Sequence, residues 1–380
     1  MTTRLPTITL LALVAAKMAV AGNPAPARPL LGLAPWPSGL TPHSLMAAQR
    51  RIRSSADMVS FAYENVPWVE LLQGRAYPRK LQEDIAEKKQ ERRALRLLLT
   101  LSPLNKDHDG LAAETKNSER NDFDERSKVE PSTTLRGKWL SDPEIQQAYA
   151  EHCRRMVLAL QPDFLVVGSG AAELLKKRPA AWEDYCALTK FVVARLRREF
   201  PKLRVGQSVA LHDLLKPGTA EPAVSAETIA KLGKLIDLHD FNGASVHPVL
   251  FGLHTEAELA AALGTLRLLS AKPAAITDAS YPAETVEIPA LKIRFPSSPT
   301  EQETFVRVLL DWARTQRSPF VVWSAGKDLD ALWDLLPEPA RSYLRLFRDS
   351  GLIDEDDQER PAYRLWTRTL KGQPIVSRRA

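Results

Sequence analysis

The sequence predicts a single domain of the α/β class, folded as an eight-stranded parallel (β/α) barrel, or TIM barrel. Three observations lead to this prediction. Short apolar runs recur along the chain, amphipathic helical patterns separate them, and no Gly-rich phosphate loop follows the first run. Continuous apolar strands that alternate with helices are typical of a parallel sheet covered by helices, and eight such units close into a barrel.

The predicted strands are runs rich in Val, Leu, Ile and Phe, and each ends in a polar or turn cluster. In chain order they span residues 30–34, 58–63, 95–101, 164–167, 204–210, 241–246, 274–277 and 320–323. Predicted helices, with apolar residues at helical spacing, lie between the strands, most clearly at 144–160, 182–200 and 302–315. An open dinucleotide-binding sheet is disfavoured because Gly32 and Gly39 do not form a GxGxxG motif.

The first 21 residues have the pattern of an export signal. Arg4 precedes an apolar run at 5–16, and Ala19-Val20-Ala21 matches an A-x-A cleavage site. An uncleaved anchor is the alternative, but the apolar run is shorter than the ~20 residues that cross a bilayer. We therefore expect cleavage near Ala21 and a secreted or periplasmic product, peripheral to the membrane or free of it.

A Pro/Ala linker is expected at 22–29 and the barrel domain at 30–375. Within the domain, residues 105–138 are dense in charged and polar side chains, which predicts a long loop after the third strand. Residues 281–299 are Pro-rich and are expected to be irregular. The net charge of +6 is spread among interleaved acids and bases, so a nucleic-acid partner is not expected. We expect a monomer.

The two cysteines, Cys153 and Cys186, occur outside any CxxC or Cys/His cluster, which argues against a structural metal. Both fall on apolar faces of predicted helices. Export permits a disulfide between them, but two buried thiols are the favoured interpretation. No motif for a cofactor is present, and we expect none.

Several segments at the strand ends together resemble the clan of retaining glycosidases with a (β/α) barrel, in particular its endo-β-1,4-galactanase-like members. The segments are GLAPWP at 32–37, DMVSFAYENVPW at 57–68, PDFLVVG at 162–168, KPAAITDASYP at 272–282, VVW at 321–323, and GLID at 351–354 with Pro361-Ala362. The resemblance implies a barrel whose site lies at the C-terminal ends of the strands.

The clan's reaction uses two carboxyl groups about 5 Å apart, one as acid and one as nucleophile. The resemblance implies that the acid should follow Gly168, where this chain has Ser169 and Gly170. It places the nucleophile at Asp278, a side chain one methylene shorter than glutamate. The catalytic glutamates are therefore not retained. Glu173 is a candidate for a displaced acid, although a carboxylate is also favourable in the first turn of a helix.

Further candidate site residues follow the predicted strands. Four polar residues are expected at the mouth and to bind substrate: Glu64, His212, His247 and Asp328. Four aromatic residues there are candidates to stack on a sugar ring, with core packing as the alternative: Trp36, Trp68, Tyr281 and Trp323. His212, Asp213 and His247 could act as metal ligands, but no HxH pair lies on the first strand, and no metal is expected.

Two hypotheses for function remain. The first is an exported carbohydrate-active barrel that binds oligo- or polysaccharide with lost or altered hydrolysis. The second is a non-enzymatic envelope scaffold that uses the same barrel, with 105–138 as its contact loop. The missing acid favours binding over hydrolysis, and the polar mouth argues against a purely structural role.

Overall fold

The computed structural model describes residues 28–373, apart from 93, 116–134, 289–292, 334, 337–340 and 342–344. The expected signal peptide, most of the linker, the centre of the polar insertion and residues 374 and 375 of the expected domain lie outside the described residues. Within the described part, no helix has both the length and the apolar character required to cross a membrane.

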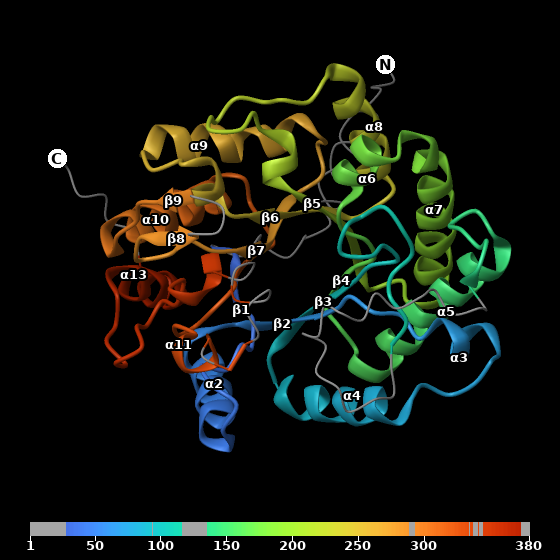
Figure 1. The fold of residues 1–380 in the computed structure, drawn as a ribbon, viewed down its shortest axis with the longest axis horizontal. Helices are drawn as coiled ribbons and strands as arrows, with labels where there is room; N and C mark the ends of the chain where they lie inside the picture. Colours follow the sequence, from blue (N-terminus) through green and yellow to red (C-terminus); the bar gives the residue numbers. More distant parts are fainter. Residues whose placement is uncertain are drawn as a thin grey trace, which may run out of the picture.

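Eight parallel strands form a closed barrel in the order β1-β10-β7-β6-β5-β4-β3-β2 (Figure 1). They are β1 (Leu30–Leu33), β2 (Met58–Tyr63), β3 (Arg96–Leu101), β4 (Phe164–Val166), β5 (Arg204–Ala210), β6 (Phe241–Val246), β7 (Ala274–Ala279) and β10 (Phe320–Trp323). All eight predicted strands are confirmed to within two residues. The largest difference is at β7, which continues two residues further than predicted and so includes Asp278.

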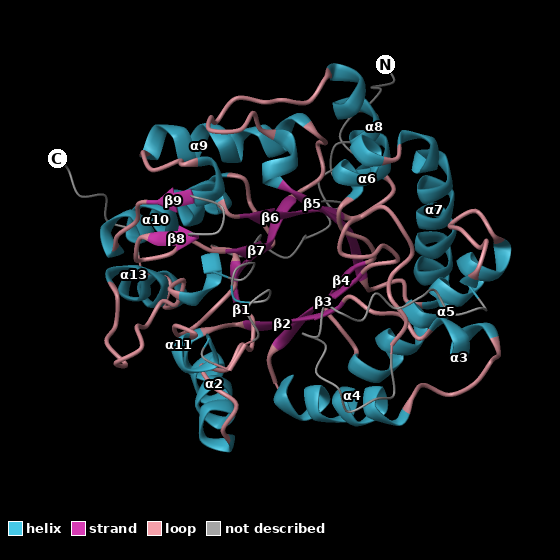
Figure 2. Cartoon of the chain, viewed as in Figure 1, coloured by secondary structure: helices cyan, strands magenta, loops and turns pink. Residues whose placement is uncertain are grey.

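Helices surround the strands on the outside of the barrel (Figure 2). They are α2 (Pro42–Ser55), α3 (Trp68–Leu72), α4 (Arg79–Arg92), α5 (Pro143–Leu160), α6 (Ala171–Lys177), α7 (Trp182–Glu199), α8 (Ala226–Asp237), α9 (Glu256–Gly264), α10 (Pro299–Thr315), α11 (Asp330–Trp333) and α13 (Pro361–Leu370). Short 3-10 turns are η2 (Pro179–Ala181), η3 (Leu211–Leu214), η4 (Pro248–Phe251) and η5 (Thr265–Leu268). The Pro-rich stretch expected to be irregular contains a small antiparallel pair, β8 (Val286–Ile288) and β9 (Ile293–Phe295).

The interior of the barrel is a packed apolar core. Phe164, Phe241 and Phe320 are the first residues of β4, β6 and β10, and their rings meet edge to face with centroids 4.7 to 6.0 Å apart. Because each ring starts a parallel strand, the three phenylalanines close the N-terminal end of the barrel. The opposite end, where the strands finish, is left for polar side chains.

The starts of the strands are fixed by a repeated device. Asp57, Asp163 and Asp240 each accept a hydrogen bond from a backbone N–H of a neighbouring strand, at 2.8 to 2.9 Å. Each carboxylate is also paired with an arginine, from Arg28, Arg96 or Arg197 respectively. These contacts hold the register at the N-terminal face.

The two cysteines lie on neighbouring helices, as predicted, and both thiols are free. Cys153 on α5 is buried, whereas Cys186 on α7 is half-buried.

A buried histidine on α5 makes the fold sensitive to acid. Burial lowers the pKa of His152 to about 3, helped by the positive charge of Arg155, and its Nδ1 lies 2.9 Å from the Tyr77 hydroxyl. Burial likewise lowers the pKa of His239 to about 4, against the effect of its bond to the Leu235 carbonyl. Both rings are therefore neutral in the folded chain above pH 4, whereas an unfolded histidine takes up a proton near pH 6.5.

Proton binding by the unfolded chain determines how the stability of the fold changes with pH. Below about pH 6.5 the unfolded chain binds more protons, so stability is full above that pH and falls as the pH drops toward 4 and 3. At pH 5 each ring accounts for about 2 kcal/mol of lost stability. We expect His152→Gln to reduce the difference between the thermal midpoints at pH 7 and pH 5. The control is His43→Gln, at an exposed site on α2; an equal reduction in both variants would contradict the assignment.

Candidate active site

Asp278 lies at the mouth of the barrel, as expected from its position at the end of the seventh strand. Its Oδ1 accepts a hydrogen bond from the Ser324 hydroxyl, and its Oδ2 is 3.4 Å from Nε2 of His247. The carboxylate side chain is 41% exposed, so it is both held and accessible. Asp278 can therefore accept a proton or meet a ligand at the mouth.

His247 is held in place from three sides. Its Nδ1 is 2.7 Å from the Ser280 hydroxyl, its ring meets the Phe347 ring edge-on at 5.3 Å, and its Nε2 faces Asp278. The pairing of β6 with β7 shifts by one residue after Ala244, so Asp278 lies opposite Ser245, and the ends of the two strands bring His247 and Asp278 together.

His212 and Asp213 form the next part of the mouth, in η3 directly after β5. Burial lowers the pKa of His212, and the charge of Asp213, whose carboxylate is 3.7 Å away, opposes this. Burial raises the pKa of Asp213, against the charge of His212. The charges of His247 and His108 also act on His212, so these four titratable groups are electrostatically linked. Nδ1 of His212 is buried without a hydrogen-bond partner among the described residues.

The position of the expected acid is filled by a histidine that the sequence interpretation missed. Gly170 has φ +71°, and a Cβ placed there would lie 1.9 Å from Cδ2 and 2.3 Å from Nε2 of His108. No side chain can therefore project from residue 170 while His108 stays in place. His108 belongs to the polar insertion, 62 residues earlier in the sequence, and no local pattern pointed to it.

Glu173 is part of α6 and is bonded on both oxygens. Its Oε2 is 2.9 Å from Nδ1 of His108, and its Oε1 is 2.7 Å from Nζ of Lys177. Burial acts to raise the pKa of Glu173, but the hydrogen bonds from Lys177 and His108 outweigh it and lower the pKa below its ordinary value. A displaced acid would need the opposite shift, so the geometry favours the alternative of a first-turn helix carboxylate.

Glu64 also follows its strand at the mouth but lies in solvent. Its exposed carboxylate is 3.6 Å from Nζ of Lys106 in the polar insertion. This is a surface ion pair of the kind that contributes little to stability. A role in binding substrate stays a prediction.

Three of the four aromatic candidates belong to the core. Trp68, Tyr281 and Trp323 are fully buried. Each donates a side-chain hydrogen bond to a backbone carbonyl, of Ala112, Leu253 and Ser350 respectively. With no exposed ring face, none of them can stack on a sugar as placed here, and core packing is the correct interpretation.

Trp36 is different. It follows β1 at the mouth and is 46% exposed. Together with Leu33, Arg51 and Gly326 it lines a small cavity beside β10. It is the member of the aromatic group with a ring face available to a ligand.

Asp328 was expected to bind substrate, but the structure gives it a structural contact. It is buried and accepts hydrogen bonds from Nη1 and Nη2 of Arg360, at 2.8 and 2.6 Å, and from the backbone N–H of Gly351 at 2.7 Å. Burial raises the pKa of Asp328, and Arg360 opposes this. Because the side chain is buried and both its oxygens are bonded to protein groups, Asp328 is not available to a sugar.

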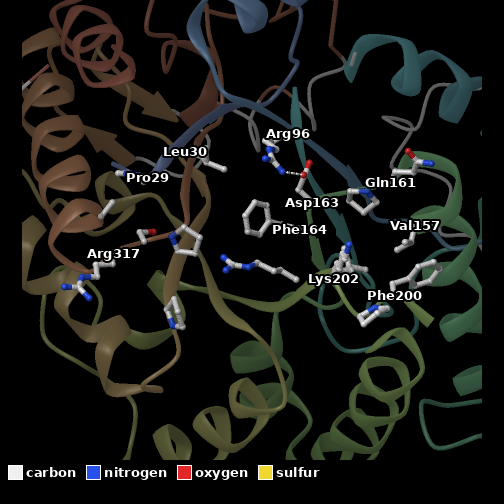
Figure 3. A pocket seen from close by; sticks show the side chains of 18 of the residues that line it. Pro29, Leu30, Arg96, Val157, Gln161, Asp163, Phe164, Phe200, Lys202 and Arg317 are labelled. Atoms are coloured by element: carbon white, nitrogen blue, oxygen red, sulfur yellow. Dashed lines mark hydrogen bonds and ion pairs between the residues drawn. The ribbon is translucent and has the colours of Figure 1, made fainter. Parts of the chain in front are cut away.

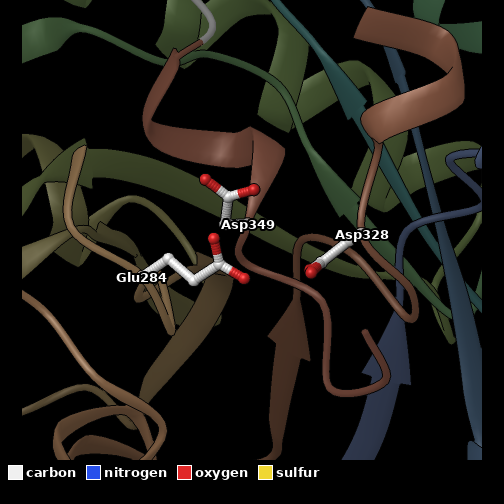
Figure 4. Close-up of side chains that lie close together, drawn as sticks. All are labelled: Glu284, Asp328 and Asp349. Carbon is white, nitrogen blue, oxygen red and sulfur yellow. The ribbon is translucent and has the colours of Figure 1, made fainter. Parts of the chain in front are cut away.

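The carboxylates of Glu284, Asp328 and Asp349 lie close together, with one oxygen of each within 4.8 Å of the others, which is near enough to hold one cation (Figure 4). Arg360 also lies 3.3 Å from Glu284, and Arg348 lies 2.8 Å from Asp349. All three carboxylates are therefore paired with one of two guanidinium groups, which makes the cluster an ionic network of the fold.

A cavity of about 1340 Å³ lies at the other end of the barrel (Figure 3). It is lined by the strand starts, including Leu30 and Phe164, and by the Arg96–Asp163 ion pair. Although it is the larger hollow, we place the candidate site at the mouth, because the N-terminal face carries the contacts that fix strand register and barrel sites lie at the opposite face.

Comparison with solved structures identifies the fold. No family model and no curated protein matches the chain. An exo-β-1,4-mannosidase from Opitutaceae bacterium strain TAV5 superposes with a TM-score of 0.60 at 12% identity, over 91% of this chain and 59% of that one. GH5_18 from Streptomyces cattleya, in complex with GlcNAc, gives 0.56 at 14%, over 90% and 80%. The chain has the (β/α)8 barrel of the glycosidases. Fungal β-1,4-galactanases give 0.53 at 14%, over 84% and 90%.

At these identities the likeness concerns the fold alone, and this chain spans 59% of the mannosidase's length. The (β/α)8 barrel fold places the polar mouth around Asp278 at the end where such barrels carry their sites.

Proposed function

We propose that this protein is an exported carbohydrate-binding barrel whose hydrolytic activity is slow or lost compared with ordinary glycosidases. One observation carries the proposal: Asp278 is held, accessible, at the mouth, while the space beside Gly170 is taken by His108. Glu173, the carboxyl group that contacts His108, has a lowered pKa and is a poor proton donor. Binding does not require that proton transfer.

The polar and aromatic groups of the mouth suit a sugar ligand. Hydroxyl groups can bond to Asp278 and His212, and Trp36 offers an exposed ring face on which a pyranose can stack. The names of the similar structures support β-linked mannose or galactose units as first ligands to test.

Trp36→Ala is expected to weaken oligosaccharide binding by about 10- to 100-fold, the scale of 1.4 to 3 kcal/mol for losing a stacked aromatic contact. Titration calorimetry with β-1,4-linked manno- and galacto-oligosaccharides measures this. Phe191→Ala, at a 38% exposed position on α7, is the matched control and should bind as the unaltered protein does. An absence of heat with every glycan would reject the proposal in favour of the envelope-scaffold hypothesis.

A further inference from the structure

The inference concerns His108, and it rests on the proposed function. The loop that carries His108 is docked onto α6 by three contacts. Lys177 donates to the carbonyl of Asp107 at 2.9 Å, Arg178 donates to the carbonyl of Asp109 at 2.7 Å, and His108 itself meets Glu173.

Within the loop, the side-chain oxygen of Asn105 accepts hydrogen bonds from the backbone N–H groups of Asp109 and Gly110. His108 has φ +53°, a left-handed conformation that is uncommon for residues other than glycine. The loop is thus built around a defined ring position.

The two nitrogens of His108 have different surroundings. Nδ1 is 2.9 Å from Glu173, which fixes the ring and favours a proton on that nitrogen. Nε2 has no hydrogen-bond partner in the part of the chain that the structure describes, and the side chain is 24% exposed. The Nε2 edge of the ring lies against Gly170, where only a glycine leaves room for it. An imidazole oriented by a carboxylate, with its second nitrogen not bonded to another of these residues, is the arrangement of a general acid or base.

Asp278 lies across the mouth from His108. His108 lies against Gly170, which follows β4, and Asp278 is at the end of β7. In the barrel order β7-β6-β5-β4, His247 after β6 and His212 after β5 come between them, and His247 contacts Asp278. A sugar bound over His212 and His247 would therefore have His108 on one side and Asp278 on the other.

We propose that His108 is the proton donor for a slow hydrolysis of β-glycosides at this site, with Glu173 as its positioning residue. The step starts with a proton on each ring nitrogen of His108. A water oxygen bonds to the anomeric carbon and gives its proton to Asp278, while the glycosidic C–O bond breaks. The departing oxygen keeps the bonding electron pair and takes the proton from Nε2 of His108. Exchange with solvent then returns a proton to His108 and removes one from Asp278.

Leaving-group dependence tests the assignment, because a departing oxygen needs a proton only if it is basic. The probes are β-1,4-mannobiose and β-1,4-galactobiose, whose leaving groups need the acid, and the corresponding 2,4-dinitrophenyl glycosides, whose leaving group does not. His108→Ala should lower kcat/KM by about 100-fold or more on the disaccharide and change it little on the dinitrophenyl glycoside. Added imidazole should restore part of the lost activity.

Two further variants separate chemistry from loop structure. His108→Gln keeps a side chain that can bond to Glu173 but cannot act as an acid. It should therefore also lower kcat/KM on the disaccharides and change it little on the dinitrophenyl glycosides. His43→Ala, an exposed histidine on α2, should cleave both substrates as the unaltered protein does.

An equal loss on both substrates in His108→Ala and His108→Gln would overturn the proposal, and so would an unaltered protein that cleaves neither. In the latter case, heat of glycan binding that is sensitive to Trp36→Ala would show that the proposed function stands without the catalytic step. An absence of both would reject the two together.

Discussion

Trp323→Ala is expected to lower the free energy of unfolding by about 3 to 5 kcal/mol, the range for removing a large buried aromatic side chain. The ring is fully buried against Phe305, with centroids 5.9 Å apart, and its N–H donates to the Ser350 carbonyl at 2.9 Å. The substitution therefore leaves both a cavity and a buried carbonyl without its partner.

Denaturant unfolding followed by circular dichroism measures this change. Trp36→Ala removes the same side chain from an exposed position and should change the midpoint little. If Trp323→Ala proved as stable as Trp36→Ala, the ring would not belong to the core, and its earlier interpretation as a sugar platform would return.

Arg360→Leu is the second substitution with a large expected effect. It leaves the buried Asp328 without the two guanidinium bonds that face it, and breaking a buried ion pair by removing one partner lowers stability by about 3 to 5 kcal/mol. Without Arg360, burial raises the pKa of Asp328 unopposed by that charge. The folded variant then binds a proton that the unfolded chain releases near pH 4, so its stability falls as the pH rises.

We therefore expect Arg360→Leu to lose more stability, relative to the unaltered protein, at pH 7.5 than at pH 5. Thermal unfolding at both pH values measures this difference. Asp328→Asn in the same chain should recover part of the lost stability at pH 7.5, because it removes the charge. Arg364→Leu, on the exposed side of α13, is the matched control. A loss of stability that does not depend on pH would show that the carboxylate of Asp328 is not the charge that the substitution leaves unpaired.

The barrel could be predicted from the sequence because its signal is local. Each strand is buried on both faces, so it appears as a short apolar run, and polar or turn residues mark its end. The end of β7 was placed too early because Asp278 interrupts the apolar run, although Asp278 and Ala279 continue the strand pairing.

The site was harder to predict because its contacts join residues that lie far apart in the sequence. Asp328 has its partner 32 residues away in Arg360, and His108 has its partner 65 residues away in Glu173. Spacing along a strand puts Trp323 and Tyr281 near the mouth but does not show whether another element covers the ring. For His108, the polar composition of its loop predicted only a long connection.

The closure of the barrel also constrains the order of events during synthesis. β1 pairs with β10, Leu30 opposite Phe320, and after the last strand α13 returns to α2: Trp366 donates to the Ser55 carbonyl, and the Tyr363 and Ser55 hydroxyls are 2.8 Å apart. A nascent chain that still lacks residue 323 thus has an exposed edge on β1, and one that still lacks residue 366 has an α2 without this contact. Such an edge is a site for pairing with other chains. The first strand acquires both its neighbours only when most of the polypeptide has been made, so the barrel closes late in synthesis.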